Sequence, residues 1–125
     1  MENKKTVLAI DDNPQQLREF RLFLVPKYDL RVVKSASEAV HFLNGNKVDI
    51  ILLDILMPNV GGFEFLSDIR KISSYTYVPI IIVSGNTEEG FFARARDSGA
   101  NDVLLKPVKQ NELVSAIEKA LSKGN

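Results

Sequence analysis

Short apolar runs alternate along the chain with longer segments in which apolar residues recur every three or four positions. The short runs are typical of strands buried on both faces of a sheet, and the longer segments are typical of amphipathic helices. Five strands are expected, at residues 6–10, 30–33, 49–53, 79–83 and 103–105. The regular alternation predicts an α/β fold, with a parallel sheet covered by helices on both faces.

Capping residues and helix breakers mark the expected helices. Asn13 and Pro14 predict the start of a helix with an apolar stripe, which Pro26 ends. Gly99 is expected to end a weakly patterned helix. That helix is expected at residues 88–98. A further helix, after Gly61 and Gly62, is expected to carry an apolar face of Phe65, Leu66, Ile69 and Ile72. Two others are expected at residues 37–44 and 110–122. Because little chain follows the last of these, we expect one (βα)₅ domain of the doubly wound type over residues 1–125, without a linker or second domain.

Composition removes several classes of function. Lys+Arg and Asp+Glu both number 16, so the charge balance favours neither a nucleic-acid partner nor a membrane surface. The absence of cysteine excludes disulfides, thiol nucleophiles and cysteine-based zinc sites, and is compatible with a reducing compartment. The N-terminus lacks the apolar core of a signal peptide, and the apolar run at 50–58 is too short to cross a bilayer. We therefore expect a cytoplasmic protein.

Polar residues collect where the expected strands end. Asp11 and Asp12 follow the first strand, Asp54 the third, Ser84 the fourth and Lys106 the fifth. In open α/β sheets, ligands bind outside the carboxyl ends of the strands, near the point where strand order reverses. The sequence therefore predicts that these five side chains share one site.

Three carboxylates at one edge repel one another unless a cation compensates them, and Mg²⁺ is the natural cation because it prefers oxygen ligands and phosphate. Asp12 and Asp54 are candidates for direct ligands, with Asp11 acting through water. One carboxylate can then attack phosphorus, and Asp54 is the candidate because it follows the most buried strand. Lys106 supplies positive charge and Ser84 a hydroxyl donor, which phosphoryl transfer needs for positioning and charge neutralisation.

These motifs together resemble the receiver domain of response regulators in two-component signalling, including chemotaxis regulators. The resemblance is carried by Asp11-Asp12, Asp54 within LLDILMPNVGG, Ser84-Gly85, Gly99-Ala100 and Lys106-Pro107, and it covers essentially the whole chain. It implies a flavodoxin-like strand order of 2-1-3-4-5 and a cis bond at Lys106-Pro107. It also implies that the backbone carbonyl of Leu56 completes the metal site.

The resemblance further implies a role in signalling. A histidine kinase or a histidine phosphotransfer protein would donate the phosphoryl group, and the domain would catalyse only its own phosphorylation and dephosphorylation. Leu56 and Asn86 would tune the dephosphorylation rate. The downstream target, or a fused effector, stays unidentified, and we expect a monomer or a weak dimer.

One position departs from the family pattern. Many receivers have Tyr or Phe three residues before the lysine and use its rotamer as a readout, but this chain has Val103, which is stiff and has no ring. Any switch would need another bistable element, and the segment 86–98 is our first candidate. A binding module that works without phosphorylation is therefore the chief alternative.

Single residues argue against two other functions and give expectations for the aromatic residues and the histidine. A flavin-binding protein is disfavoured because Asp11 and Asp12 would repel the cofactor's phosphate. A small-molecule phosphatase with an aspartyl-phosphate intermediate is disfavoured because Leu56 stands where such enzymes usually have a second acid. Phe91 and Phe92 are expected to be core residues and not a ligand platform, with the alternative that one ring is exposed for partners. His41 is expected to be a surface or packing residue.

Overall fold

The structure is a computed structural model that describes residues 3–56, 61–72, 75–85 and 88–123. Strands and helices alternate along these residues. The strands are β1 (Thr6–Ile10), β2 (Asp29–Val33), β3 (Ile50–Leu53), β4 (Ile80–Ser84) and β5 (Asp102–Leu105). The helices are α1 (Pro14–Leu24), α2 (Ala36–Leu43), α3 (Gly62–Lys71), α4 (Phe91–Asp97) and α5 (Gln110–Ser122).

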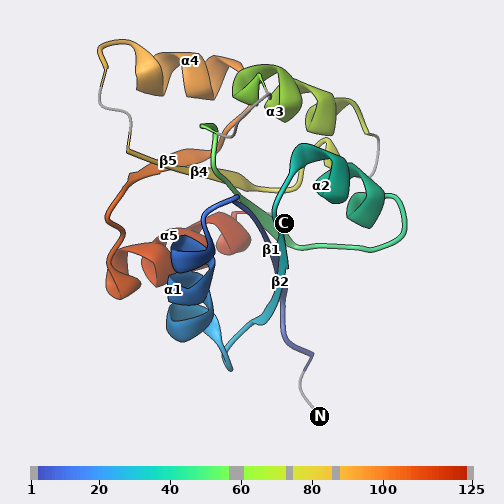
Figure 1. Ribbon diagram of the computed structural model, residues 1–125, viewed down its shortest axis with the longest axis vertical. Helices are drawn as coiled ribbons and strands as arrows, with labels where there is room; N and C mark the ends of the chain where they lie inside the picture. The colour runs from blue at the N-terminus through green and yellow to red at the C-terminus, as the bar shows by residue number, and fades with distance from the viewer. Residues whose placement is uncertain (1–2, 57–60, 73–74, 86–87, 124–125) are drawn as a thin grey trace.

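All strand pairs are parallel, and the strands lie in the order β2-β1-β3-β4-β5. The predicted order 2-1-3-4-5 is therefore confirmed. The chain reverses its direction of winding between β1 and β3, so α1 and α5 cover one face of the sheet while α2, α3 and α4 cover the other (Figure 1). This is the doubly wound α/β architecture that the alternation predicts.

Alternate residues of each central strand serve two separate cores. In β1, Leu8 and Ile10 join the cluster that lies against α2, α3 and α4, whereas Val7 and Ala9 join the cluster against α1 and α5. The same alternation holds in β3 and β4, whose apolar residues are almost completely buried. Burial on both faces explains why these strands are continuous apolar runs, since neither face meets water.

Most expected boundaries agree within one residue, and α4 is the exception. This helix begins at Phe91, and not near residue 88 as predicted, because Gly90 adopts a left-handed backbone conformation with φ 85°. A residue with that φ does not continue a right-handed helix. Helix α2 begins at Ala36 because the Ser35 side chain caps it by accepting a hydrogen bond from the Glu38 N–H.

Of the pair Phe91 and Phe92, one ring lies in the core and the other is exposed, which is the alternative that the sequence left open. Phe91 is buried, and its ring lies 5.6 Å from the ring of Phe63 on α3. Phe92 remains 47% exposed, although its ring lies only 6.2 Å from that of Phe91. Adjacent helical positions lie about 100° apart around the axis, so a short surface helix buries one member of such a pair and exposes the other. His41 is exposed, so of the two expected roles, surface or packing, it has the surface one.

Gly62, the first residue of α3, packs against the backbone of Ile55, the neighbour of Asp54. A Cβ atom at Gly62 would lie 2.4 Å from the Ile55 carbonyl oxygen and 2.5 Å from its Cγ2. Neither contact is with a flexible side-chain end, so the strand end or the helix would have to move. The absence of a side chain at Gly62 thus lets α3 start against the segment that carries Asp54.

Gly62→Ala is expected to lower the free energy of unfolding by about 1–3 kcal/mol, through overpacking against Ile55. Gly61→Ala is the matched control, because a Cβ there meets mainly the mobile Glu64 carboxylate, and its effect should stay within about 0.5 kcal/mol. Urea unfolding of both variants measures the difference. Equal stabilities for the two would contradict the close approach of α3 to Ile55.

Candidate functional site

Hydrogen bonds of the sheet continue past the strand ends and fix the backbone of the site residues. The Asp54 N–H donates to the carbonyl of Ile10 at 2.9 Å, and the Lys106 N–H donates to the carbonyl of Ser84 at 2.9 Å. The Asp11 N–H likewise donates to the Val33 carbonyl at 3.2 Å. The positions of the predicted site residues are therefore set by the parallel register and not by loose loops.

The three predicted acidic residues do come together. Asp11, Asp12 and Asp54 each offer a carboxylate oxygen, and these three atoms lie within 4.8 Å of one another. Asp11 and Asp54 are buried, with exposures of 1% and 5%, whereas Asp12 is exposed. The cluster is thus anchored in the protein on one side and open to water on the other.

Local backbone donors orient the two buried carboxylates. The Asn13 N–H donates to Asp11 Oδ1 at 2.9 Å, and the Leu56 N–H donates to Asp54 Oδ1 at 3.0 Å. In both cases the donor is two residues after the aspartate, which is the Asx-turn pattern. Asn13 also caps α1 through its own side chain, so the helix start and the orientation of Asp11 are coupled.

Lys106 reaches both buried carboxylates from the end of β5. Its Nζ lies 3.2 Å from Asp11 Oδ2 and 3.8 Å from Asp54 Oδ2. The first distance is a charged hydrogen bond, and the second is an ion pair without one. The Lys106-Pro107 peptide bond is cis, as the family resemblance implies.

The pKa of Asp54 is raised above the ordinary value for an aspartate. Burial is the largest cause, since it disfavours the charged form, and the charge of Asp11 acts in the same direction. The Leu56 N–H and the Lys106 ammonium oppose the shift but do not cancel it. Asp54 is therefore a buried carboxylate whose one ammonium partner and one backbone donor do not offset the effect of burial on its pKa.

Without a metal, this environment should cost stability near neutral pH. When folding raises the pKa of a group, protonation of that group favours the folded state. This contribution to stability is complete at a pH below the pKa in the unfolded chain, and it is lost as the pH rises through the pKa in the folded protein. Asp54→Asn should therefore raise the free energy of unfolding at pH 7 by on the order of 1 kcal/mol in buffer containing EDTA. The advantage over the parent should shrink as the pH falls toward 4.

Thermal or urea unfolding as a function of pH measures this difference, with Asp68→Asn as the control at an exposed aspartate of α3. The control should behave like the parent at every pH. An Asp54→Asn variant that is less stable than the parent at pH 7, or whose advantage grows on acidification, would contradict the assigned direction of the pKa shift.

The remaining predicted residues lie at the rim or beside the cluster. Ser84 is fully buried as the last residue of β4, and Leu56 is 60% exposed two residues after Asp54. Asn86 lies outside the described residues, as does the first part of the segment 86–98. Gly62 supports the site, but the sequence analysis did not assign it that role. The only signal for it was the Gly61-Gly62 pair at the start of α3.

The donor set fits a hard divalent cation. Formally, three ionised carboxylates and one ammonium group leave two negative charges, which one divalent cation balances. Carboxylate oxygens are preferred by Mg²⁺, which also keeps several waters, and the exposed side of Asp12 leaves room for them. The residues present therefore fit Mg²⁺, the cation that the sequence predicts.

Comparison with known families agrees with this site. The family model of the response regulator receiver domain matches residues 7–118, and the chain belongs to that family. It is a receiver domain of the two-component signalling class, with the acidic pocket formed by Asp11, Asp12 and Asp54. The flavin-binding and phosphatase alternatives are thereby set aside.

The protein matches the whole of one relative but only part of the length of others. It is 29% identical over 118 residues to protein PilH of Pseudomonas aeruginosa, covering 93% of this chain and 97% of PilH. It is 32% identical over 118 residues to the CAI-1 autoinducer sensor kinase/phosphatase CqsS of Vibrio cholerae, covering 92% of this chain but only 17% of CqsS. For the rice two-component response regulator ORR1, the match covers 51% of that protein.

Solved structures show the same fold. The chemotaxis protein CheY4 of Vibrio cholerae superposes with a TM-score of 0.89 at 26% identity, covering 95% of this chain and all of CheY4. A response regulator from Chloroflexus aurantiacus gives a TM-score of 0.90 at 26% identity, covering 96% of this chain. Within the described part of the chain, no helix has the length and apolar character needed to span a membrane.

Proposed function

We propose that Asp54 is the phosphoacceptor of this receiver domain. The observation that carries the proposal is the difference between the two buried carboxylates. Both oxygens of Asp11 are held, one by the Asn13 N–H and the other by Lys106 at 3.2 Å. Asp54 has one oxygen held by the Leu56 N–H, while Oδ2 lies 3.8 Å from Lys106, beyond hydrogen-bonding distance. Asp54 is therefore oriented by the backbone, while its Oδ2 lacks the short hydrogen bond to Lys106 that Asp11 has.

Receiver domains typically bind Mg²⁺ at such an acidic cluster. In this chain we assign the metal to the carboxylates of Asp12 and Asp54, to Asp11 through water, and to the backbone carbonyl of Leu56. Bound Mg²⁺ would neutralise charge on the phosphoryl oxygens and bring the phosphoryl group up to the carboxylate. Titration of Mg²⁺ into variants of Asp11, Asp12 and Asp54 tests these assignments.

The transfer itself uses few protein groups. A carboxylate oxygen of Asp54 forms a bond to phosphorus while the bond between phosphorus and the donor's imidazole nitrogen breaks, and its electron pair stays with the imidazole. During transfer, negative charge develops on the phosphoryl oxygens beside the Asp54 carboxylate. We propose that the Lys106 ammonium, 3.8 Å from Asp54 Oδ2, stabilises this charge. We assign to the hydroxyl of Ser84, the last residue of the neighbouring strand β4, a hydrogen bond to one of those oxygens.

Receiver domains are signalling switches whose partners are histidine kinases or histidine phosphotransfer proteins. For this chain we propose a phosphohistidine donor, a cytoplasmic location and a single receiver domain over residues 1–125 that is a monomer or a weak dimer. The balanced charge and the absence of cysteine support this assignment. Beyond its own phosphorylation and dephosphorylation, no catalytic activity is assigned to it.

Intact-mass measurement with acetyl phosphate tests the proposed chemistry. The parent should gain one phosphoryl group in the presence of Mg²⁺ and none in the presence of EDTA, and hydroxylamine should remove the group because an acyl phosphate is reactive toward it. No gain with Mg²⁺ present, or a product that resists hydroxylamine, would contradict an aspartyl phosphate. The binding module that works without phosphorylation would then be favoured.

A further inference from the structure

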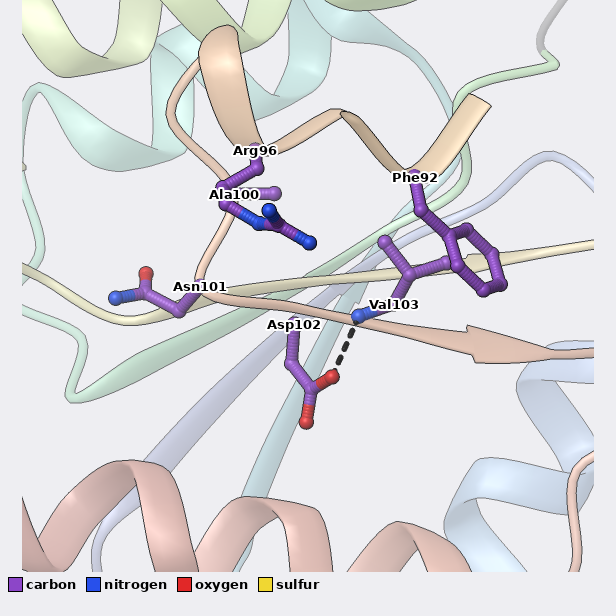
Figure 2. Close-up of a pocket in the computed structure, with 6 residues that line it drawn as sticks. All are labelled: Phe92, Arg96, Ala100, Asn101, Asp102 and Val103. Atoms are coloured by element: carbon purple, nitrogen blue, oxygen red, sulfur yellow. Dashed lines mark hydrogen bonds between the residues drawn. The ribbon is translucent and has the colours of Figure 1, made fainter. Parts of the chain in front are cut away.

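A hollow of about 160 Å³ lies between α4 and β5, outside the acidic site (Figure 2). Phe92 and Arg96, one turn apart on α4, form its walls. Ala100 and Val103 contribute small side chains to it, and Asn101 and Asp102 complete the lining. Position 103, whose side chain lines the hollow, carries a valine and not a ring.

The hollow has the right size for one phenyl ring. A cavity of about 150 Å³ lined by apolar side chains is large enough to bind benzene. The ring of Phe92 already lies at the edge of the hollow, beside Val103, and 47% of the residue is exposed (Figure 2). Phenylalanine on a helix has two common χ1 rotamers, so the ring has a second position without any change of backbone.

Phe92 is also linked to Asp54 by packed groups. Gly62 lies against Ile55, the residue after Asp54, and the next residue, Phe63, packs its ring 5.6 Å from that of Phe91. The ring of Phe91 in turn lies 6.2 Å from that of Phe92. A shift of the segment that carries Asp54 therefore reaches the first turn of α4 through direct contacts.

The first turn of α4 is the part of that helix best able to respond. The helix has only seven residues, starts at the left-handed Gly90, and receives no side-chain capping hydrogen bond. Helices of this length depend on their packing for stability. The guanidinium of Arg94, 4.3 Å from the Phe63 ring centre, adds a second contact between α4 and the start of α3.

We propose that Phe92 is a two-position gate, open in the unphosphorylated protein and closed into the hollow above Val103 when Asp54 is phosphorylated. The gate supplies the bistable element that Val103 itself does not provide. Closing removes an apolar ring from the surface between α4 and β5 and covers the hollow, so the two states present different surfaces to a protein partner. The inference rests on the proposed phosphorylation of Asp54.

Fluorine NMR tests the gate directly. The seven phenylalanines are labelled as 4-fluorophenylalanine, and the Phe92 resonance is the one lost in Phe92→Leu. Line broadening by a soluble gadolinium chelate reports the exposure of each ring. Phosphorylation should reduce the broadening at Phe92 by about two-fold or more, as expected for a shift between an exposed and a buried rotamer. The buried ring of Phe20 on α1 is the internal control and should not change.

Val103→Phe fills the hollow and is the matched variant. It should be phosphorylated like the parent, because Val103 lines the hollow and is not a member of the acidic cluster, but its Phe92 should stay exposed in both states. Phe92 broadening that is unchanged or increased in parent protein whose mass shows full phosphorylation would overturn the gate alone. Failure of the parent to gain phosphate would remove the proposed function, and the gate with it.

Discussion

Lys106→Met is expected to slow phosphorylation of Asp54 by about a hundredfold, the usual consequence of removing one preorganised group that stabilises transition-state charge. Methionine keeps much of the unbranched side chain of lysine but removes the ammonium group that lies 3.2 Å from Asp11 and 3.8 Å from Asp54. The initial rate of mass gain with acetyl phosphate, at saturating Mg²⁺, measures the effect.

Lys106→Arg is the control for charge alone. It keeps a positive charge, but its planar guanidinium is larger and spreads that charge over several nitrogens, so it should recover only part of the rate. Circular dichroism checks that both variants are folded. A methionine variant with a rate within about threefold of the parent would contradict the place of Lys106 in charge stabilisation.

Arg70→Met is expected to lower the free energy of unfolding by at least about 3 kcal/mol, because charged hydrogen bonds contribute about 1.5–3 kcal/mol each. The Arg70 guanidinium donates to the carbonyl of Gly99 at 2.7 and 3.0 Å and to Asn101 Oδ1 at 2.7 Å. It also donates to three carbonyls of the loop between α3 and β4, those of Tyr75, Thr76 and Val78. Burial lowers the pKa of Arg70, and no carboxylate among the described residues pairs with it.

The guanidinium therefore joins three parts of the chain: the end of α3, the following loop, and the turn between α4 and β5. Urea unfolding measures the loss, with Arg18→Met as the control at an exposed arginine of α1. Arg70→Lys should recover little, because one ammonium group cannot match the fork of the guanidinium. A loss below about 1 kcal/mol in Arg70→Met would show that water replaces these hydrogen bonds at little cost.

The sequence predicted most of the fold because its strongest signals are local. Strand β3 is a continuous aliphatic run, and α5 has an apolar stripe with the same bounds in the sequence and in the structure. The acidic site was predictable for a different reason. Parallel strands end at a common edge of the sheet. The positions of Asp11, Asp54 and Lys106 directly after three expected strands were therefore enough to predict that they lie close together.

The features that escaped prediction depend on tertiary contacts. The acceptors around Arg70 are mostly backbone carbonyls, which every residue has, so no residue pattern marks them. The start of α4 was misplaced because the sequence does not show that Gly90 adopts a left-handed φ. Nor does a pair of phenylalanines tell which ring is buried, since that depends on where Phe63 lies.

The most direct test of the central claim is to locate the phosphorylated residue. Borohydride reduces an aspartyl phosphate to homoserine, which then identifies the acceptor in a peptide digest by mass. After treatment with acetyl phosphate and Mg²⁺, the account predicts homoserine at position 54 and at none of the other aspartates, and no homoserine in Asp54→Asn. Homoserine at Asp11 or Asp12 in the parent protein, with Asp54 unchanged, would contradict the assignment.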